Sequence, residues 1–210
     1  APKVKTLNCV EPSAEAISQA KIFLKDFRNC KFENSDVMKS NLEDNSQDFG
    51  YCLGVLHHVP DTYLGLEKCV VKLKKGAPFL LYLYYRFDNK PLWFKFIWFI
   101  SNILRNLISK FPFKLKLFIT KIIAFTIYFP LARLALFFSK LGIKTSNFPL
   151  SFYKNSSLYT MQTDSLDRFG TRLEHRFTKI EILNMMKNAG LVNIKFNEKS
   201  PYWVAVGEKK

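Results

Sequence analysis

The chain has 210 residues and a formal net charge of +15, and 48% of its residues are hydrophobic. This composition excludes an intrinsically disordered chain and is sufficient for one domain with a core, or for a domain with an insertion. The charge is concentrated in one place: residues 89–163 contain eleven lysines and arginines and no acidic residue, so all other residues together carry +4.

The four cysteines lie far apart, and their spacing is not that of a metal site. They are Cys9, Cys30, Cys52 and Cys69. Reduced thiols in apolar runs are typical of proteins from a reducing compartment. The first residues are polar and basic, without the apolar core of a signal peptide. Both observations predict a cytoplasmic protein.

The first elements alternate between strand and helix. Residues 4–10 predict a short strand that ends at Glu11, and the helix after it has an apolar face and a capping residue, Ser13. Residues 30–33 predict a second strand, which leads into a turn containing Asp36.

Residues 43–73 are the centre of the predicted fold. The apolar run 49–56 is typical of a buried parallel strand, and His57-His58, a Pro60-Asp61 turn and a helix follow it. Residues 78–85 predict a further apolar strand. Strands that alternate with helices at this spacing predict an α/β fold with a parallel sheet. Ligands of such sheets bind beyond the carboxyl ends of the strands, so residues 53–58 are the first candidate site.

A basic insertion interrupts this alternation. Residues 91–141 predict three amphipathic helices separated by Pro112 and Pro130, and their longest charge-free run, 122–132, is too short to cross a bilayer. We therefore expect no transmembrane helix. The preferred interpretation is a cap over the substrate end of the sheet, with the apolar side inward and the lysines and arginines outward. The alternative is an element that lies on an anionic membrane surface.

The last segment returns to the α/β pattern. Thr178 and Glu181 form the capping box of a helix, and residues 192–196 and 202–206 predict an antiparallel hairpin with a turn at Ser200-Pro201. The predicted domains are a core of residues 1–88 and 164–210 and a helical insertion of residues 89–163.

Several polar residues follow the predicted strands. Glu11 could bind a ribose diol and Asp36 an adenine amine, but a carboxylate at a helix start or in a turn is commoner. His57 and His58 could act as acid, base or substrate ligand, although a histidine pair in a loop is more often structural. No third ligand lies close to them in the sequence, so no metal site is predicted.

The order of these segments resembles that of class I S-adenosylmethionine-dependent methyltransferases. The similar segments are VEPS, NCKFENSD, EDNSQDFGYCLGVLHHVPD and LKKG with the strand after it, and near the end TKIEI, AGLVNI and YWVAVG. They cover residues 4–85 and 178–207, and LGVLHHVPD is the most specific. The resemblance implies a Rossmann-like, mostly parallel sheet with an antiparallel terminal hairpin, and a methyltransferase that uses S-adenosyl-L-methionine as cofactor.

The resemblance also implies roles for single residues. Glu11 would bind the cofactor ribose, and Asp36 with the backbone of Val37 the adenine. Residues 53–55 would line the methionine end, with His57 and His58 near the transferred methyl group. The implied cofactor-binding residues are Glu11, Asp36, Val37, Leu53, Gly54 and Val55. Orientation and desolvation would lower the barrier, and no strong base is assigned.

One departure from the family concerns its glycine-rich loop, which should precede the strand that ends at Glu11. None of the eight glycines forms such a loop after a strand. We therefore expect an N-terminally truncated chain that lacks the central strand of its sheet and binds the cofactor weakly or not at all by itself.

The predicted function is methyl transfer to a small or lipid-like acceptor, with the insertion covering the substrate site. The alternative is a non-catalytic relative that binds RNA or a membrane surface, since a basic segment attracts phosphates. Against RNA, the aromatic residues of the insertion are mostly phenylalanines at core spacing, and its predicted helices contain only two arginines, Arg105 and Arg133.

Overall fold

The structure is a computed structural model that describes residues 1–199 and 202–210, so the predicted turn at Ser200-Pro201 lies outside the described residues. The chain forms two compact units. The core unit comprises residues 1–86 and 175–210, and the helical unit comprises residues 87–174. The sequence had placed the insertion at residues 89–163, whereas residues 164–174 belong here to the helical unit.

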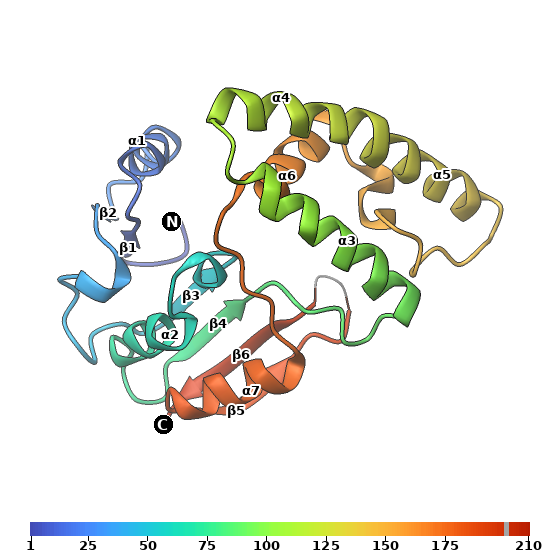
Figure 1. The fold of residues 1–210 in the computed structure, drawn as a ribbon. Coiled ribbons are helices and arrows are strands. Elements are labelled where there is room, and N and C mark those ends of the chain that lie inside the picture. The colour runs from blue at the N-terminus through green and yellow to red at the C-terminus, as the bar shows by residue number, and fades with distance from the viewer. Residues whose placement is uncertain (200–201) are drawn as a thin grey trace. The chain divides into compact units, whose positions relative to one another are not determined.

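The core unit alternates strands and helices, which confirms the α/β class. Its elements are β1 (Leu7–Val10), α1 (Ala14–Phe23), β2 (Cys30–Glu33), β3 (Gly50–Leu53), α2 (Thr62–Val71), β4 (Pro78–Tyr82), α7 (Lys179–Asn188), β5 (Leu191–Phe196) and β6 (Val204–Lys209) (Figure 1). The helix starts follow the sequence signals: Ser13 caps α1, Asp61 caps α2, and Thr178 and Glu181 form the capping box of α7.

The strands form two sheets. β1 and β2 pair in parallel, and the second sheet has the order β3-β4-β6-β5, with a parallel β3–β4 pair and an antiparallel end. The antiparallel terminal hairpin of the prediction is therefore confirmed, but the single sheet of the prediction is divided. Among the described strands, β1 and β3 each have one neighbour, so each keeps an edge without a strand partner. The division thus lies between the second and third strands along the chain.

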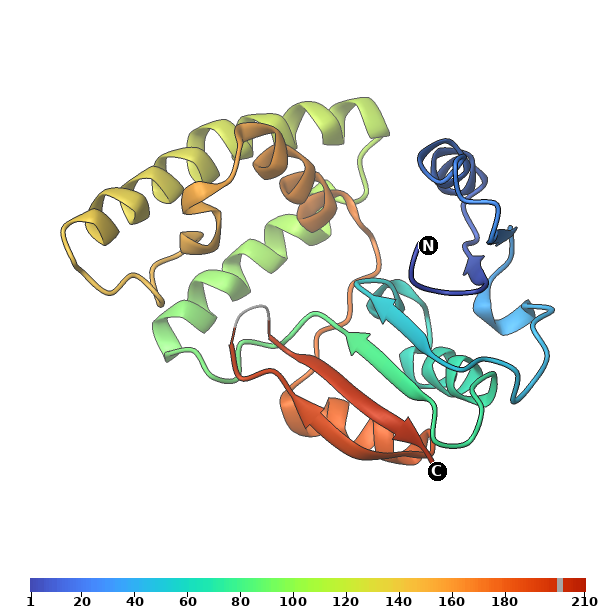
Figure 2. The same cartoon turned by 180° about the vertical axis from the view of Figure 1, so that it is seen from behind.

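One face of the four-stranded sheet carries the core. Leu81 on β4 packs with Leu66 and Val70 of α2 and with Ile182 and Met186 of α7, all of which are buried. Figure 1 shows α2 and α7 on the same side of the sheet, and Figure 2 shows the opposite side with no helix of this unit over it.

β3 is consequently buried on one side only, which corrects the prediction of a buried strand at residues 49–56. Tyr51 and Leu53 are 52% and 48% exposed, while Cys52 between them packs against the core. Alternate residues of a strand point to opposite faces, so the uncovered face of the sheet leaves these two side chains open to solvent.

The helical unit contains α3 (Leu92–Ile108), α4 (Phe113–Ile123), α5 (Phe129–Lys140) and α6 (Leu158–Gly170). A π-helical turn, Ala124–Tyr128, joins α4 to α5, so the predicted break at Pro130 is absent. Pro130 lies in the first turn of α5, next to this π-helical turn, which is where a helix tolerates a residue without an N–H group.

The resulting helix, Phe113–Lys140, has 28 residues, and its most apolar window of 18 residues has a mean hydropathy of 1.8. It is the one helix of the described chain with the length and composition to cross a membrane. By length and composition alone, this finding departs from the sequence-based expectation. That expectation was based on the charge-free run alone, whereas a helix of this length remains apolar on average with Lys121 and Arg133 included. Buried helices can meet the same criteria, but only 22% of its most apolar window is buried.

The predicted pattern of apolar residues inside and basic residues outside holds only in part within this unit. On α3 most of the large apolar residues are exposed, whereas Arg105, Ile108 and, just after the helix, Ser109 are buried. On the long helix the buried residues are Thr120, Ala124, Tyr128, Ala132 and Ala135. The interior of this unit therefore combines small and hydrogen-bonding side chains with an apolar cluster that includes Ile108, Tyr128, Met161 and Phe169.

Candidate active site

The carboxyl ends of β3 and β4 lie at the same edge of the sheet, because the two strands are parallel. Gly54 follows β3 with a φ of +73°, a left-handed conformation that favours glycine, and its N–H donates to the carbonyl oxygen of Tyr82 (3.0 Å). A Cβ atom built on Gly54 would have no neighbour closer than 3.9 Å, so its backbone is open to a ligand. The flanking side chains, Leu53 and Val55, are exposed. The predicted residues 53–55 thus form an accessible strand end.

His57 lies just beyond this strand end, in the short 3₁₀ turn Leu56–His58. Its side chain is fully buried, and its ring stacks on Tyr84 and contacts His58, with ring centroids 3.7 and 4.1 Å apart. Neither ring nitrogen has a hydrogen-bond partner among the described residues. Burial, followed by the nearby His58, Arg176 and His175, lowers the pKa of His57 to about 3. The imidazole is therefore neutral at pH 7 and a weak base, able to donate or accept a hydrogen bond.

The structure adds a third histidine that the sequence analysis missed. The backbone N–H of His175 donates to the carbonyl oxygen of His57 (2.8 Å), and the buried Nε2 atom of His175 has no hydrogen-bond partner in the described part of the chain. All three histidines of the protein therefore lie together. No local pattern predicts this, because His175 lies far along the chain from the other two.

Tyr84 and Arg176 complete this cluster. The guanidinium of Arg176 lies 5.1 Å from the ring centroid of Tyr84, on the ring that stacks with His57. Arg176 also donates to the carbonyl oxygen of Tyr85 (3.3 Å). The cluster therefore combines aromatic rings, a cation and the neutral imidazole of His57. This chemistry suits a polar or aromatic acceptor group.

Glu11 and Asp36 lie at the carboxyl ends of β1 and β2. The N–H of Glu11 donates to the carbonyl oxygen of Glu33 (3.1 Å), and Asn34 Nδ2 donates to the carbonyl oxygens of Glu11 and Pro12 (3.0 and 2.9 Å). These bonds hold the two loops together. The two predicted carboxylates therefore stand at one edge of the small sheet.

Each carboxylate also has the structural role that is commoner for such residues, because each accepts a hydrogen bond from a backbone N–H group close to it in the chain. Glu11 Oε1 accepts from the N–H of Ser13, and Asp36 Oδ1 accepts from the N–H of Met38, both at 2.9 Å. The second oxygen of each has no hydrogen bond within residues 1–199 and 202–210. Each carboxylate therefore keeps an oxygen for a ligand hydroxyl or amine.

β1 and β3 are close in space although they belong to different sheets. Asn8 Nδ2 on β1 donates to Gln47 Oε1, just before β3 (2.8 Å). The pKa of the Cys52 thiol on β3 is raised to about 11, first by burial and also by the negative charge of Glu11. Glu11 therefore lies within electrostatic range of β3.

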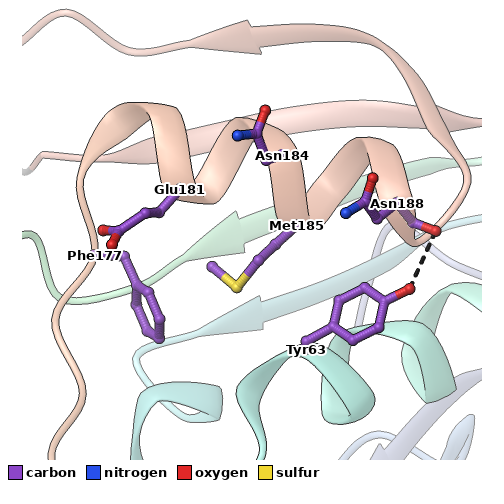
Figure 3. Close-up of a pocket in the computed structure, with 6 residues that line it drawn as sticks. All are labelled: Tyr63, Phe177, Glu181, Asn184, Met185 and Asn188. Atoms are coloured by element: carbon purple, nitrogen blue, oxygen red, sulfur yellow. Dashed lines mark hydrogen bonds between the residues drawn. The ribbon is translucent and has the colours of Figure 1, made fainter.

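No cavity described in the structure brings Glu11, Asp36 and Gly54 together. The larger one, about 310 Å³, lies between α2 and α7 (Figure 3). Its lining residues are Tyr63, Phe177, Glu181, Asn184, Met185 and Asn188. The second, about 210 Å³, includes Val37 beside Met38 and residues of α2. The described chain thus presents the predicted site residues along a strand edge and not inside a closed pocket.

These residues fit part of the cofactor that the resemblance implies. The free oxygens of Glu11 and Asp36 and the open backbone at Gly54 suit the ribose, the adenine and the methionine end, respectively. The sequence contains no glycine-rich loop that would bring further backbone close to the cofactor. The fit therefore rests on side chains and on one strand end.

Residues 1–81 match the family model of the methyltransferase domain. No curated protein matches the sequence. The fold is similar to that of a proposed methyltransferase of Bacillus halodurans, with 13% identity and a TM-score of 0.53, over 94% of this chain and 59% of that one. A methyltransferase of Methanosarcina mazei that depends on S-adenosylmethionine also has 13% identity, with a TM-score of 0.50, over 97% of this chain and 82% of that one.

The CurJ carbon methyltransferase has a TM-score of 0.53 at 10% identity, over 99% of this chain and 43% of that chain. The chain thus spans 59% of the Bacillus halodurans relative and less than half of CurJ. At these identities the structural likeness shows the fold alone, and the family model matches 81 of the 210 residues. The chain therefore has the fold of class I S-adenosylmethionine-dependent methyltransferases, and its residues 1–81 are similar to the methyltransferase domain.

Proposed function

We propose that the protein transfers a methyl group from S-adenosyl-L-methionine to a small or lipid-like acceptor. The observation that carries this proposal is the arrangement of Glu11, Asp36 and Gly54 at consecutive strand ends, each with an oxygen or backbone group open to a ligand. The family match over residues 1–81 includes all three.

In this proposal each residue has one binding task. Glu11 accepts hydrogen bonds from the ribose, Asp36 with the Val37 backbone holds the adenine, and residues 53–55 line the methionine end. The cofactor supplies an electrophilic methyl group on a sulfonium. The protein contributes orientation and exclusion of water, which together can account for much of the rate enhancement.

His57 and His58 would then lie near the acceptor. Because the pKa of His57 is lowered to about 3, we assign His57 the task of holding the acceptor by a hydrogen bond and not that of a general base. The unpartnered ring nitrogens of His57 and the buried Nε2 of His175 support this assignment, since a bound acceptor would satisfy them.

The edges of β1 and β3 that have no strand partner affect the affinity that we expect for the cofactor. A strand between them would join the two sheets and could bring a glycine-rich loop to the cofactor. We therefore propose that this polypeptide alone binds the cofactor weakly, and that the helical unit governs access of the acceptor. The four cysteines are free thiols, which supports the proposed cytoplasmic location.

Binding of radiolabelled S-adenosylmethionine tests the proposal. We expect weak binding by this chain and tighter binding by a chain extended at its N-terminus, and equal binding by the two would contradict the role of a central strand. In the extended chain, Glu11→Gln should weaken binding by roughly tenfold, the value of one or two hydrogen bonds to a charged group. Glu15→Gln is the matched control, because Glu15 lies exposed one turn into α1.

A further inference from the structure

The helical unit has two apolar surfaces that no other element of this unit covers. On α3 nine large apolar side chains are exposed: Leu92, Trp93, Phe96, Ile97, Phe99, Ile100, Ile103, Leu104 and Leu107. Their spacing of three and four residues puts them on one side of the helix. Isolated exposed apolar residues are ordinary on a protein surface, but a continuous stripe of this length marks an interaction site.

The opposite side of α3 is held inside the unit by hydrogen bonds. Arg105, 7% exposed, donates to Asn102 Oδ1 (3.0 Å) and to the carbonyl oxygens of Thr171 and Arg172 (3.0 and 3.2 Å). Arg168 of α6 pairs with Glu174 (2.8 Å) and contacts Ser101 of α3. Turning the apolar side inward would break these bonds. The exposed stripe is therefore built into the fold.

The long helix Phe113–Lys140 repeats this arrangement. Its inner side carries Thr120, whose carbonyl oxygen accepts from Ser165 Oγ of α6 (3.0 Å). Its exposed apolar residues are Phe113, Leu115, Phe118, Ile122, Phe125, Ile127, Leu134 and Phe137. Polar groups of both helices form hydrogen bonds with α6, and buried residues of the long helix also pack in an apolar cluster with Met161 and Phe169 of α6. Figures 1 and 2 show α6 beside both helices. The two stripes are named here the apolar face of the helical unit.

The charge around this face identifies its partner. Residues 89–163 have no acidic side chain, and exposed lysines stand around the stripes. These lysines are Lys110, Lys114, Lys121, Lys140 and Lys144. At 1.5 Å per residue the long helix extends for about 42 Å. An apolar stripe bordered by lysines is complementary to a lipid surface with anionic headgroups, where lysines reach phosphates and the apolar residues enter the acyl boundary.

We propose that the apolar face of the helical unit docks on the surface of an anionic phospholipid bilayer. The helices lie in the plane of the interface, with α6 and the buried arginines on the side away from the lipid. A second copy of the chain would bring its own lysines against these lysines, and RNA would leave the apolar stripes in water. Neither explains both features of the face.

Co-sedimentation of the whole chain with vesicles tests this docking and does not depend on methyl transfer. We expect binding to vesicles of equal parts phosphatidylcholine and phosphatidylglycerol, weaker binding to phosphatidylcholine alone, and release at high salt. Phe96→Glu and Phe118→Glu should each weaken binding by about tenfold or more, because each removes a large buried side chain from the lipid. Lys114→Gln and Lys121→Gln should each weaken it by roughly fivefold at low salt.

The matched control is Phe23→Glu on α1, a phenylalanine of the core unit that is more exposed than Phe96 and Phe118 and takes the same change of charge. It should bind vesicles as the parent does, and circular dichroism should show all variants folded. Equal binding to neutral and anionic vesicles, or unchanged binding by Phe96→Glu and Phe118→Glu, would overturn the proposal. So would resistance to extraction at alkaline pH, which indicates a spanning helix, or a vesicle-free dimer that Phe96→Glu dissociates.

Discussion

In the core unit the apolar side chains of β4, α2 and α7 form one buried cluster. In the helical unit most large apolar side chains of α3 and of the helix Phe113–Lys140 point to solvent, and Arg105, Thr120 and three alanines are buried beside a smaller apolar cluster. Both units contain apolar, polar and charged residues, but they differ in which of these residues they bury and which they expose. Water drives the packing of the core unit. The helical unit buries a smaller apolar cluster and leaves two long apolar stripes exposed, as the proposed contact with lipid requires.

Truncation of one apolar residue in each unit gives the largest expected difference. Leu81→Ala, at a fully buried site of β4, should lower the free energy of unfolding by about 2–5 kcal/mol. Ile103→Ala, on the exposed stripe of α3, should change it by less than about 0.5 kcal/mol in the absence of lipid. Urea unfolding followed by circular dichroism measures both, and a large loss for Ile103→Ala would show that this face packs against protein.

Removal of the buried arginine tests the polar interior of the helical unit. Arg105→Ala leaves the carbonyl oxygens of Thr171 and Arg172 without their donor, so it should cost about 1–3 kcal/mol. Lys110→Ala, an exposed cation two residues after α3, should cost much less. The same unfolding measurement compares the two, and equal losses would contradict a hydrogen-bonded interior.

A pH series examines the histidine cluster of the core unit. The pKa of His57 is lowered from 6.5 to about 3, so the unfolded chain binds the proton more tightly. The stability that neutral His57 contributes is complete above pH 6.5 and is lost as the pH falls toward 3, by up to about 2 kcal/mol between pH 7 and pH 5. His57→Phe keeps an aromatic ring on Tyr84 and should lose this part of the pH dependence. An unchanged pH profile in His57→Phe would show that another group titrates.

The smallest expected effect comes from replacing Gly54, and it separates the free-energy cost of backbone strain from a loss of cofactor affinity. Gly54→Ala and Gly76→Ala both replace a glycine of positive φ (+73° and +79°) with open space around it, so each should cost about 1–2 kcal/mol. Only Gly54→Ala should also weaken cofactor binding, because Gly76 lies before β4, far along the chain from the strand end. Calorimetry with S-adenosylhomocysteine on an N-terminally extended chain measures this, and equal weakening by both variants would remove Gly54 from the site.

Much of the core unit could be predicted because its signals are local. The serine, aspartate and threonine caps, the apolar strand of β4 and the terminal hairpin all depend on residues near one another, and the structure confirms them. The order of the strand-end residues Glu11, Asp36 and Gly54 follows from the same pattern. His175 could not be found in this way, because only the return of the chain from the helical unit brings it to His57.

The sequence by itself determined the α/β class, the family resemblance and the position of a basic amphipathic segment, because each depends on the local order of residue types. Only the tertiary structure decided which side of each helix faces inward. Periodicity shows that a helix has two different sides, but which side is buried depends on the groups that the neighbouring elements present. Here α6 and the loop after it present carbonyl oxygens, a serine and an arginine–glutamate pair. For the same reason the division of the sheet at β1 and β3 and the clustering of the three histidines could be known only from the folded chain.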